Sequence, residues 1–237
     1  MVIGAIFAGG IGSRMGSADM PKQYLQLGSK PIIAHTIEKF AVNPGIDQVI
    51  VLCPKAWIAH TKDIIKKYLG ERANVAVVEG GATRNGTLEN ALKYIAENYD
   101  IDDESVIVTH DAVRPFVTHR IISENIEAAR KYGACDTVIP ATDTIVDSAD
   151  GKVIRSIPPR HELFQGQTPQ SFNIKELSTV LASLTEDEKE ILTDACKIFT
   201  IKNKPVHIVE GEVFNIKITY TYDLRVANAL LGVAEND

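Results

Sequence analysis

A glycine-rich segment near the start of the chain carries two basic side chains. Residues 8–15 read Ala-Gly-Gly-Ile-Gly-Ser-Arg-Met, and Lys22 follows within the segment Pro-Lys-Gln-Tyr. Glycine lets the backbone approach a ligand closely, and successive backbone N–H groups in such a loop bind anions. Because Arg14 and Lys22 place two positive charges there in a chain of net charge −6, the segment favours a polyanion. It predicts a binding site for a nucleotide triphosphate.

Two familiar phosphate-binding loops do not fit this segment. The P-loop requires Lys-Ser or Lys-Thr directly after a glycine, and neither Gly10 nor Gly12 is followed by such a pair. The dinucleotide pattern Gly-x-Gly-x-x-Gly has Met15 where the third glycine belongs. The second expected strand ends in Pro54 and Lys55 instead of an acidic ribose ligand. A P-loop NTPase and an NAD enzyme are therefore disfavoured, and a tight turn with surface charges stays as the alternative.

Two further polar segments follow expected strands. Residues 80–87 read Gly-Gly-Ala-Thr-Arg-Asn-Gly-Thr, and residues 110–115 read His-Asp-Ala-Val-Arg-Pro. Ligands of open α/β sheets bind beyond the carboxyl ends of the strands, so we expect both segments to meet the glycine loop at one site. Residues 80–87 either offer backbone groups to a base or only cap the helix that follows.

Asp111 is the candidate metal ligand. A carboxylate at a strand end can help to hold Mg²⁺ against nucleotide phosphates. The alternative is an ion pair between Asp111 and Arg114 that organises the turn. We expect a structural role for His110, because no Ser or Cys nucleophile accompanies it.

Lys217 lies in the segment Asn-Ile-Lys-Ile-Thr at residues 215–219. In a strand, Ile216 and Ile218 share one face and Lys217 lies on the other. Lys217 is either a solvated strand residue or a cation that reaches the phosphate site. Arg160 follows two prolines on an extended segment and by itself predicts little.

The composition is typical of a globular α/β protein. The chain has 237 residues, of which 45% are hydrophobic and 24% charged. Its acidic balance disfavours nucleic acid as a partner. The three cysteines, Cys53, Cys135 and Cys196, are isolated and are expected to be core residues in a reducing compartment. The N-terminal apolar run is too short for a signal peptide or a membrane span, so we expect a cytoplasmic protein with no membrane partner.

Short β-branched runs alternate with helical patterns, which is typical of a mostly parallel sheet flanked by helices. Expected strands lie at 2–7, 48–53, 75–78, 105–109 and 136–140, and expected helices at 31–40, 56–69, 84–98 and 118–132. The pattern changes after Pro140. Residues 144–146 and 152–157 flank an Asp-Gly turn and predict a hairpin arm. An isolated hairpin is only marginally stable in water, so we expect the arm to pack on a second subunit.

Further elements complete the chain after the arm. They are a segment at 167–172, helices at 173–184 and 186–199, strands at 206–209 and 214–218, and a closing helix at 222–231. We predict a single domain over residues 1–237 with a dimerisation arm at about residues 141–166.

Taken in order, the motifs resemble the cytidylyltransferase family that includes the methylerythritol-phosphate and ribitol-5-phosphate cytidylyltransferases. The motifs run essentially end to end: the glycine loop with Pro-Lys-Gln-Tyr, Gly-Gly-x-x-Arg, His-Asp-Ala-x-Arg-Pro, Gln-Thr-Pro-Gln-x-Phe, Thr-Asp and Asn-Ile-Lys-Ile-Thr. The resemblance implies a Rossmann-like nucleotidyltransferase fold with CTP and Mg²⁺ as ligands. It also implies a homodimer in which each arm reaches the active site of the partner.

The resemblance assigns site residues by position. It implies that Arg14 and Lys22 hold the triphosphate and stabilise the transition state, with Lys217 as a third catalytic cation. The implied CTP-binding residues are Ala8, Gly9, Gly10, Gly12, Arg14, Lys22, Gly81, Ala82, Thr87 and Asp111, the last also near the metal. The implied acceptor-binding residues are Arg114, Thr168, Thr193 and Lys217, with Thr144 and Arg160 supplied by the partner's arm.

Three departures favour the ribitol branch of this family. Gly9 replaces an alanine of the methylerythritol branch, Val113 replaces another, and Ala82 lacks the acidic side chain often found there. The resemblance then implies attack of ribitol 5-phosphate on CTP to give CDP-ribitol and pyrophosphate, for a wall polymer such as teichoic acid. The alternatives are a methylerythritol 4-phosphate cytidylyltransferase, a sugar-1-phosphate nucleotidyltransferase using UTP or dTTP, and a CTP-binding sensor with an inactive site.

Overall fold

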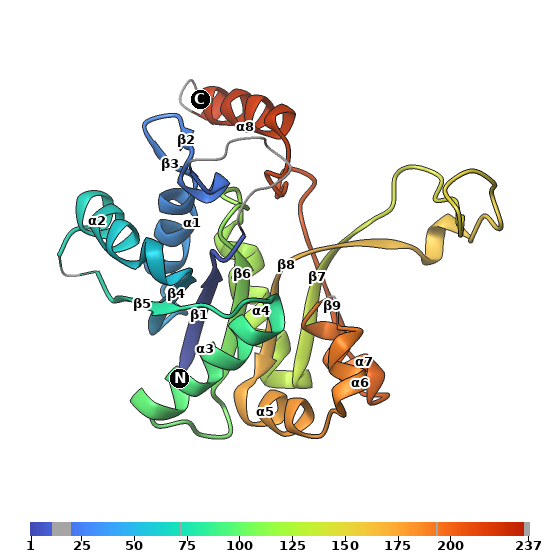
Figure 1. Ribbon diagram of the computed structural model, residues 1–237, viewed down its shortest axis with the longest axis horizontal. Helices are drawn as coiled ribbons and strands as arrows, with labels where there is room; N and C mark the ends of the chain where they lie inside the picture. Colours follow the sequence, from blue (N-terminus) through green and yellow to red (C-terminus); the bar gives the residue numbers. More distant parts are fainter. Residues whose placement is uncertain (11–19, 72, 193, 235–237) are drawn as a thin grey trace.

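A seven-stranded sheet runs through the centre of the protein (Figure 1). The computed structural model describes residues 1–10, 20–71, 73–192 and 194–234. The strand order is β5-β4-β1-β6-β8-β7-β9, and only β8 runs antiparallel to its neighbours. The strands are β1 (Val2–Phe7), β4 (Gln48–Cys53), β5 (Val75–Glu79), β6 (Val106–Asp111), β7 (Ala134–Pro140), β8 (Phe164–Asn173) and β9 (His207–Glu210). The predicted α/β class with a mostly parallel sheet is confirmed.

Helices cover both faces of the sheet because the central strands are apolar on both sides. Along β1, Val2 and Ile6 pack with helix residues such as Phe40, whereas Ile3 and Ala5 join the core on the opposite face. One face carries α1 (Ile32–Ala41), α2 (Ile58–Leu69) and α4 (His119–Tyr132), and the other carries α3 (Arg84–Asn98), α5 (Ile174–Ala182) and α7 (Cys196–Ile201). A side chain at Gly4 would meet Phe40 at 2.6 Å, so glycine is needed for α1 to pack closely.

The three cysteines are buried and unpaired, as predicted.

The C-terminal helix α8 (Thr221–Ala234) lies beside the small hairpin of β2 (Gln26–Leu27) and β3 (Lys30–Pro31), as Figure 1 shows. A separate apolar cluster joins them and includes Leu27, Ile32, Val113, Ile218 and Ala227. This packing brings the chain between β9 and α8 close to the end of β6.

Five expected elements differ from the structure, three in the body of the protein and two in the arm. The helix expected at 56–69 begins as the 3-10 turn η3 (Lys55–Trp57) before α2. The helix expected at 186–199 is divided into α6 (Glu186–Glu190) and α7, because the Asp194 carboxylate accepts hydrogen bonds from the backbone N–H groups of Cys196 and Lys197 and starts a new helix. The strand expected at 214–218 is wrong, since these residues pair with no strand of the described sheet.

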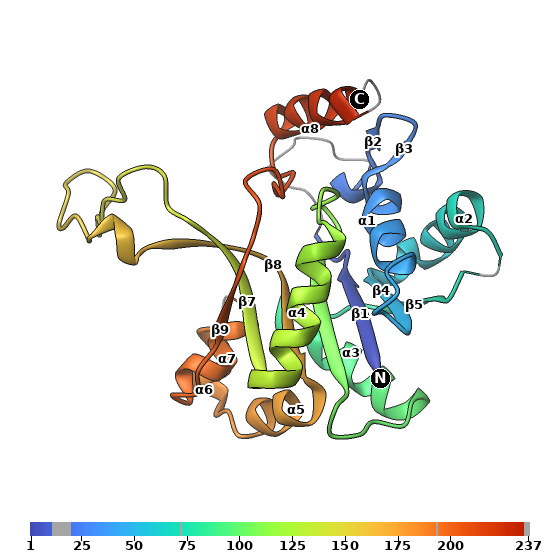
Figure 2. The same cartoon turned by 180° about the vertical axis from the view of Figure 1, so that it is seen from behind.

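The segment between β7 and β8 extends away from the body of the protein (Figures 1 and 2). The turn at residues 148–151 forms as expected, with Ser148 Oγ accepting a hydrogen bond from Gly151 N. The two expected strands do not form, and the flanking segments share the single bridge between Asp147 and Ser156. A hairpin with no further strand beside it has little to stabilise its pairing, which explains the difference.

Candidate active site

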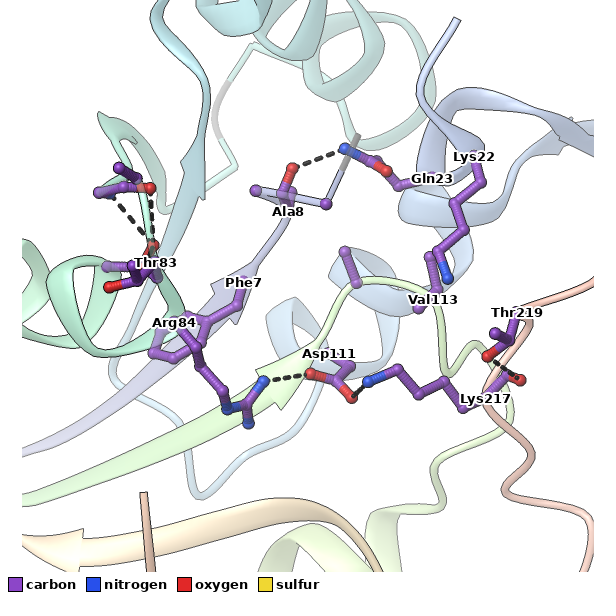
Figure 3. Close-up of a pocket in the computed structure, with 16 residues that line it drawn as sticks. Phe7, Ala8, Lys22, Gln23, Thr83, Arg84, Asp111, Val113, Lys217 and Thr219 are labelled. Carbon is purple, nitrogen blue, oxygen red and sulfur yellow. Dashed lines mark hydrogen bonds and ion pairs between the residues drawn. The ribbon is translucent and has the colours of Figure 1, made fainter. Parts of the chain in front are cut away.

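A cavity of about 440 Å³ opens where β1 and β6 end and the loop from β5 to α3 begins (Figure 3). In an open sheet of order β5-β4-β1-β6 this is the crevice in which α/β proteins bind ligands, because the connections on either side of it run in opposite directions. Many residues assigned from the sequence line it, namely Ala8, Gly9, Gly10, Lys22, Gly81, Ala82, Thr87, Asp111 and Lys217. Gly12, Arg14 and Thr193 lie outside the described residues.

Lys22 is placed by the short 3-10 turn η2 (Lys22–Tyr24). The neighbouring Gln23 is buried, and its side-chain amide donates a 2.6 Å hydrogen bond to the carbonyl oxygen of Ala8 at the end of β1. The Tyr24 ring stacks on Trp57 with 4.6 Å between ring centroids. These contacts fix the start of η2 against the sheet, so Lys22 is held at the rim of the cavity.

The loop from β5 to α3 is closed by its own hydroxyl groups. Thr83 Oγ1 caps α3 by accepting a hydrogen bond from Gly86 N at 3.0 Å, and Thr87 Oγ1 accepts one from Gly81 N at 3.1 Å. A side chain at Gly81 would lie 2.3 Å from the backbone of Gly86, so only glycine permits this tight return. The segment therefore caps the helix and also lines the cavity. The first turn of α3 lies there, and such turns favour anions.

Asp111, the last residue of β6, is surrounded by three cations. Arg84 Nη1 lies 2.5 Å from Oδ1, Lys217 Nζ lies 2.9 Å from Oδ2, and Arg114 Nε lies 3.6 Å from Oδ2. Figure 3 shows Arg84 and Lys217 approaching the carboxylate from opposite sides. Burial alone would raise the pKa of Asp111, but Arg84, Lys217 and Arg114 hold it far below its usual value. The site is thus a fixed negative charge within an excess of positive charge.

Arg84 is a cavity residue that sequence reasoning missed. It is the first residue of α3, its guanidinium lies 5.2 Å from the centre of the Phe7 ring, and it is the nearest cation to Asp111. The signal was present in the motif Gly-Gly-x-x-Arg, because an arginine in the first helical turn after a strand end is directed toward the crevice.

Arg114 and Thr168, assigned to the acceptor phosphate, are buried beside the cavity and do not line it. Arg114 Nη1 donates to the carbonyl oxygen of Asn215 at 2.8 Å, and Thr168 Oγ1 accepts from Asp111 N at 3.2 Å. His110 bonds to the Arg114 carbonyl oxygen and to the Thr168 hydroxyl, and burial lowers its pKa to about 4. The predicted structural role of His110 agrees with this neutral, fully buried side chain. The predicted pairing of Asp111 with Arg114 is present as the longest of the three contacts.

Lys217 reaches the cavity although its segment is not a strand. Lys217 lines the cavity and contacts Asp111, so it is not a solvated strand residue, and its role toward a phosphate stays a prediction. The assumed alternation is absent, because Asn215 and Ile218 are both fully buried.

Gln170 links Arg84 to two carboxylates. Gln170 is buried between Asp136 and Asp194, and its Nε2 donates to both at 3.1 and 2.7 Å, while its Oε1 lies 3.4 Å from Arg84 Nη2. Burial and the neighbouring Asp194 raise the pKa of Asp136 to about 7. This polar chain connects the cavity to β7 and α7.

Thr144 and Arg160 lie on the arm and are exposed to solvent. Arg160 Nη1 donates to the carbonyl oxygen of Thr142, also on the arm. Neither residue lines the cavity of its own chain. Their predicted contribution to a partner's site stays a prediction.

The Asp111 carboxylate suits a magnesium ion whose other ligands would be mainly phosphate oxygens of a nucleotide. Among the described residues there is no group of three or more His, Cys, Asp or Glu side chains that could hold a metal alone. Mg²⁺ at nucleotide sites typically binds one or two carboxylates together with phosphate oxygens and water. A single strand-end carboxylate in a cationic cavity meets that requirement once a triphosphate is present.

The fold and the cavity together define an α/β nucleotidyltransferase. A structure described as 4-diphosphocytidyl-2C-methyl-D-erythritol synthase from Anaerococcus prevotii DSM 20548 matches with a TM-score of 0.79 and 29% identity, over 98% of this chain and 96% of that one. The 2-C-methyl-D-erythritol 4-phosphate cytidylyltransferase of Thermus thermophilus matches with a TM-score of 0.72 and 26% identity, over 97% and 98% of the chains. The Francisella tularensis protein of the same name, with 24% identity over 97% and 99% and a TM-score of 0.77, supports the fold alone.

The family model described as IspD, 2-C-methyl-D-erythritol 4-phosphate cytidylyltransferase, matches residues 2–233. The chain therefore belongs to this family of cytidylyltransferases. In the part of the chain that the structure describes, no helix combines the length and the apolar character needed to cross a bilayer.

Proposed function

We propose that this protein transfers a cytidylyl group from CTP to the phosphate of a small polyol phosphate. The observation that carries the proposal is a glycine-lined cavity in which Arg84 and Lys217 contact Asp111 and which Lys22 also lines. Three cations in one crevice suit a triphosphate and a second phosphate at once. The family match supports the same reaction.

The reaction needs positioning and positive charge more than it needs a base. A phosphate monoester is mostly dianionic near neutral pH, since its second pKa is about 6. One of its oxygens forms a bond to the α-phosphorus of CTP while the bond from that phosphorus to the bridging oxygen breaks, and pyrophosphate leaves with the electron pair. Lys22, Arg84 and Lys217 would bring the two anions together and stabilise the charge that builds on the α-phosphate.

Magnesium would bind at Asp111 together with phosphate oxygens of CTP. When bound, the ion would neutralise charge on the triphosphate. Arg84 and Lys217, which contact Asp111 here, would then turn toward the phosphates.

The comparisons and the sequence favour different acceptors. The family model and the similar Thermus thermophilus structure name 2-C-methyl-D-erythritol 4-phosphate. They support this acceptor better than ribitol 5-phosphate, which the sequence departures favour. All three departures, Gly9, Ala82 and Val113, line the cavity. The second candidate therefore rests on specific cavity residues. Its product, CDP-ribitol, would serve a wall polymer such as teichoic acid.

Pyrophosphate release with CTP and Mg²⁺ tests the function and the acceptor together. The purified protein is given methylerythritol 4-phosphate, ribitol 5-phosphate or no acceptor, and we expect release only with an acceptor. The acceptor with the higher kcat/KM is the substrate. Absence of release with both, despite measurable CTP binding, would favour the sensor alternative.

We propose that two copies of the chain pair through the arm. Apolar side chains on the arm are exposed: Ile145 by 39%, Val146 by 48%, Val153 by 69%, Ile154 by 56% and Ile157 by 58%. The arm projects from the body, so its own chain cannot cover them (Figure 2). A second copy would bury this surface and would bring Thr144 and Arg160 to its cavity.

Complementation between variants of strongly reduced activity tests the shared site. Arg160→Ala damages the arm, and Lys217→Met damages the cavity. We expect a refolded mixture of the two variants to regain activity, because a mixed dimer has one site with both residues intact. A mixture of Lys217→Met with Lys22→Ala is the control and stays inactive, since both changes fall in the same half-site. Recovery in neither mixture would contradict the shared site.

A further inference from the structure

Lys217 lies in a segment that is neither helix nor strand, so the contacts of the residues around it fix its backbone. Its ammonium group lies 2.9 Å from Asp111 Oδ2, while the side chain is 45% exposed. The segment makes one backbone hydrogen bond toward the β6 turn, from Ile218 N to the Val113 carbonyl oxygen at 3.0 Å. A long, half-exposed lysine has many rotamers, so its position depends on how firmly its backbone is fixed.

Asn215, two residues before the lysine, supplies a buried anchor. It is 0% exposed, and its Nδ2 donates to Gln167 Oε1 at 3.1 Å and to the Thr168 carbonyl oxygen at 2.9 Å. Its own carbonyl oxygen accepts a hydrogen bond from Arg114 Nη1 at 2.8 Å. The segment is therefore tied at one point to β8 and to the turn after β6.

The groups that hold Asn215 also hold Asp111. Thr168 Oγ1 accepts from the backbone N–H of Asp111 at 3.2 Å, and Arg114 Nε lies 3.6 Å from Asp111 Oδ2. Asn215 thus connects the backbone that carries Lys217 to the two residues that fix the carboxylate. The side-chain oxygen of Asn215 has no hydrogen-bond partner among the described residues. A buried acceptor without a partner costs stability. Any benefit of an amide at this position therefore comes from the two hydrogen bonds that its Nδ2 donates.

We propose that Asn215 is a positioning residue that sets Lys217 for cytidylyl transfer. The inference rests on the proposed function, in which Lys217 contacts the reacting phosphates. A hydrophobic residue would fill the same space but would remove the hydrogen bonds to Gln167 Oε1 and to the Thr168 carbonyl oxygen. The backbone that carries Lys217 would then lose its side-chain tie to β8, where the Thr168 hydroxyl accepts from Asp111 N, and would keep the bonds of its backbone to Arg114 and Val113.

The test replaces Asn215 with serine, which is too short to reach both acceptors. We expect kcat to fall about 10–100-fold, the range in which small misplacements of a reacting group are felt, with little change in the KM for CTP. Asn125→Ser is the matched control. Asn125 is also 0% exposed and donates two hydrogen bonds, to the Ile121 carbonyl oxygen and Thr137 Oγ1, but it lies on α4 outside the cavity. It should lower stability and leave kcat per folded molecule unchanged.

A double-mutant cycle separates positioning from general damage. If Asn215 acts through Lys217, Asn215→Ser causes no further loss of kcat in a Lys217→Met background. An equal loss in both backgrounds, or the same loss in Asn125→Ser, overturns the proposal while leaving the cytidylyltransferase function intact. If Asn215→Ser does not fold, Gln167→Met removes one of the two acceptors and should show a smaller effect with the same dependence on Lys217.

A structural readout applies even if no acceptor supports turnover, which would overturn the proposed function alone. Crystal structures of the wild type and of Asn215→Ser should show the contact between Lys217 Nζ and Asp111 Oδ2 in the first and its loss in the second. Retention of the contact in the variant overturns the positioning role.

Discussion

Lys22→Ala should lower kcat by about 10²–10³-fold, the usual cost of removing one hydrogen-bond donor that stabilises charge in a transition state. The affinity for CTP should change far less. Lys22 lines the cavity on a turn that Gln23 ties to the end of β1, so we expect its charge to lie near the phosphates when the nucleotide binds. Charge on the α-phosphate rises during the transfer, and a fixed cation therefore stabilises the transition state more than the ground state.

Pyrophosphate release gives kcat for this comparison, and calorimetric titration gives the dissociation constant of CTP. Lys55→Ala is a suitable control, because Lys55 follows β4 at the same edge of the sheet but does not line the cavity. It should leave both quantities unchanged. An unchanged turnover in Lys22→Ala would remove Lys22 from the catalytic residues.

Asp111→Asn should remove activity and also destabilise the fold. The carboxylate is 8% exposed and pairs with Arg84, Lys217 and Arg114. Removing one partner of a buried ion pair costs about 3–5 kcal/mol, and we expect the lower end because Arg84 and Lys217 reach solvent. The free energy of unfolding from denaturant titration measures this loss. Asp103→Asn, whose carboxylate is 90% exposed in a surface pair with Lys175, should leave stability unchanged.

The same cluster predicts how stability depends on pH. Burial opposes ionisation of Asp111, yet its three cations lower its pKa far below the value of about 4 expected in the unfolded chain. In acid the folded state then binds fewer protons than the unfolded state. The contribution of Asp111 to the free energy of unfolding is therefore complete above the unfolded pKa of about 4 and is lost as pH falls below it. Unfolding measured between about pH 6 and pH 3 should show a steeper loss in the wild type than in Asp111→Asn. Parallel curves would contradict the assigned ion pairs.

The sequence by itself determined those helices and strands whose apolar pattern and end signals lie within the element itself. Val2–Phe7, Gln48–Cys53 and Arg84–Asn98 have the bounds that the pattern predicts, because strands buried on both faces and capped helices carry their signals in adjacent residues. The convergence of Ala8–Gly10, residues 80–87 and Asp111 also followed, since the carboxyl ends of parallel strands meet at one edge.

The tertiary structure decided the partners of those residues. Sequence spacing suggested Arg114 for Asp111, but Arg84 and Lys217 are nearer, from a helix start and a C-terminal segment that only the packed sheet brings together. The strand expected at 214–218 does not form, because a strand needs the free edge of a neighbouring strand. This segment instead bonds to the turn after β6, from Ile218 N to the Val113 carbonyl oxygen. Ion pairs and strand pairing depend on distances between elements far apart in sequence, and local periodicity contains no information about those distances.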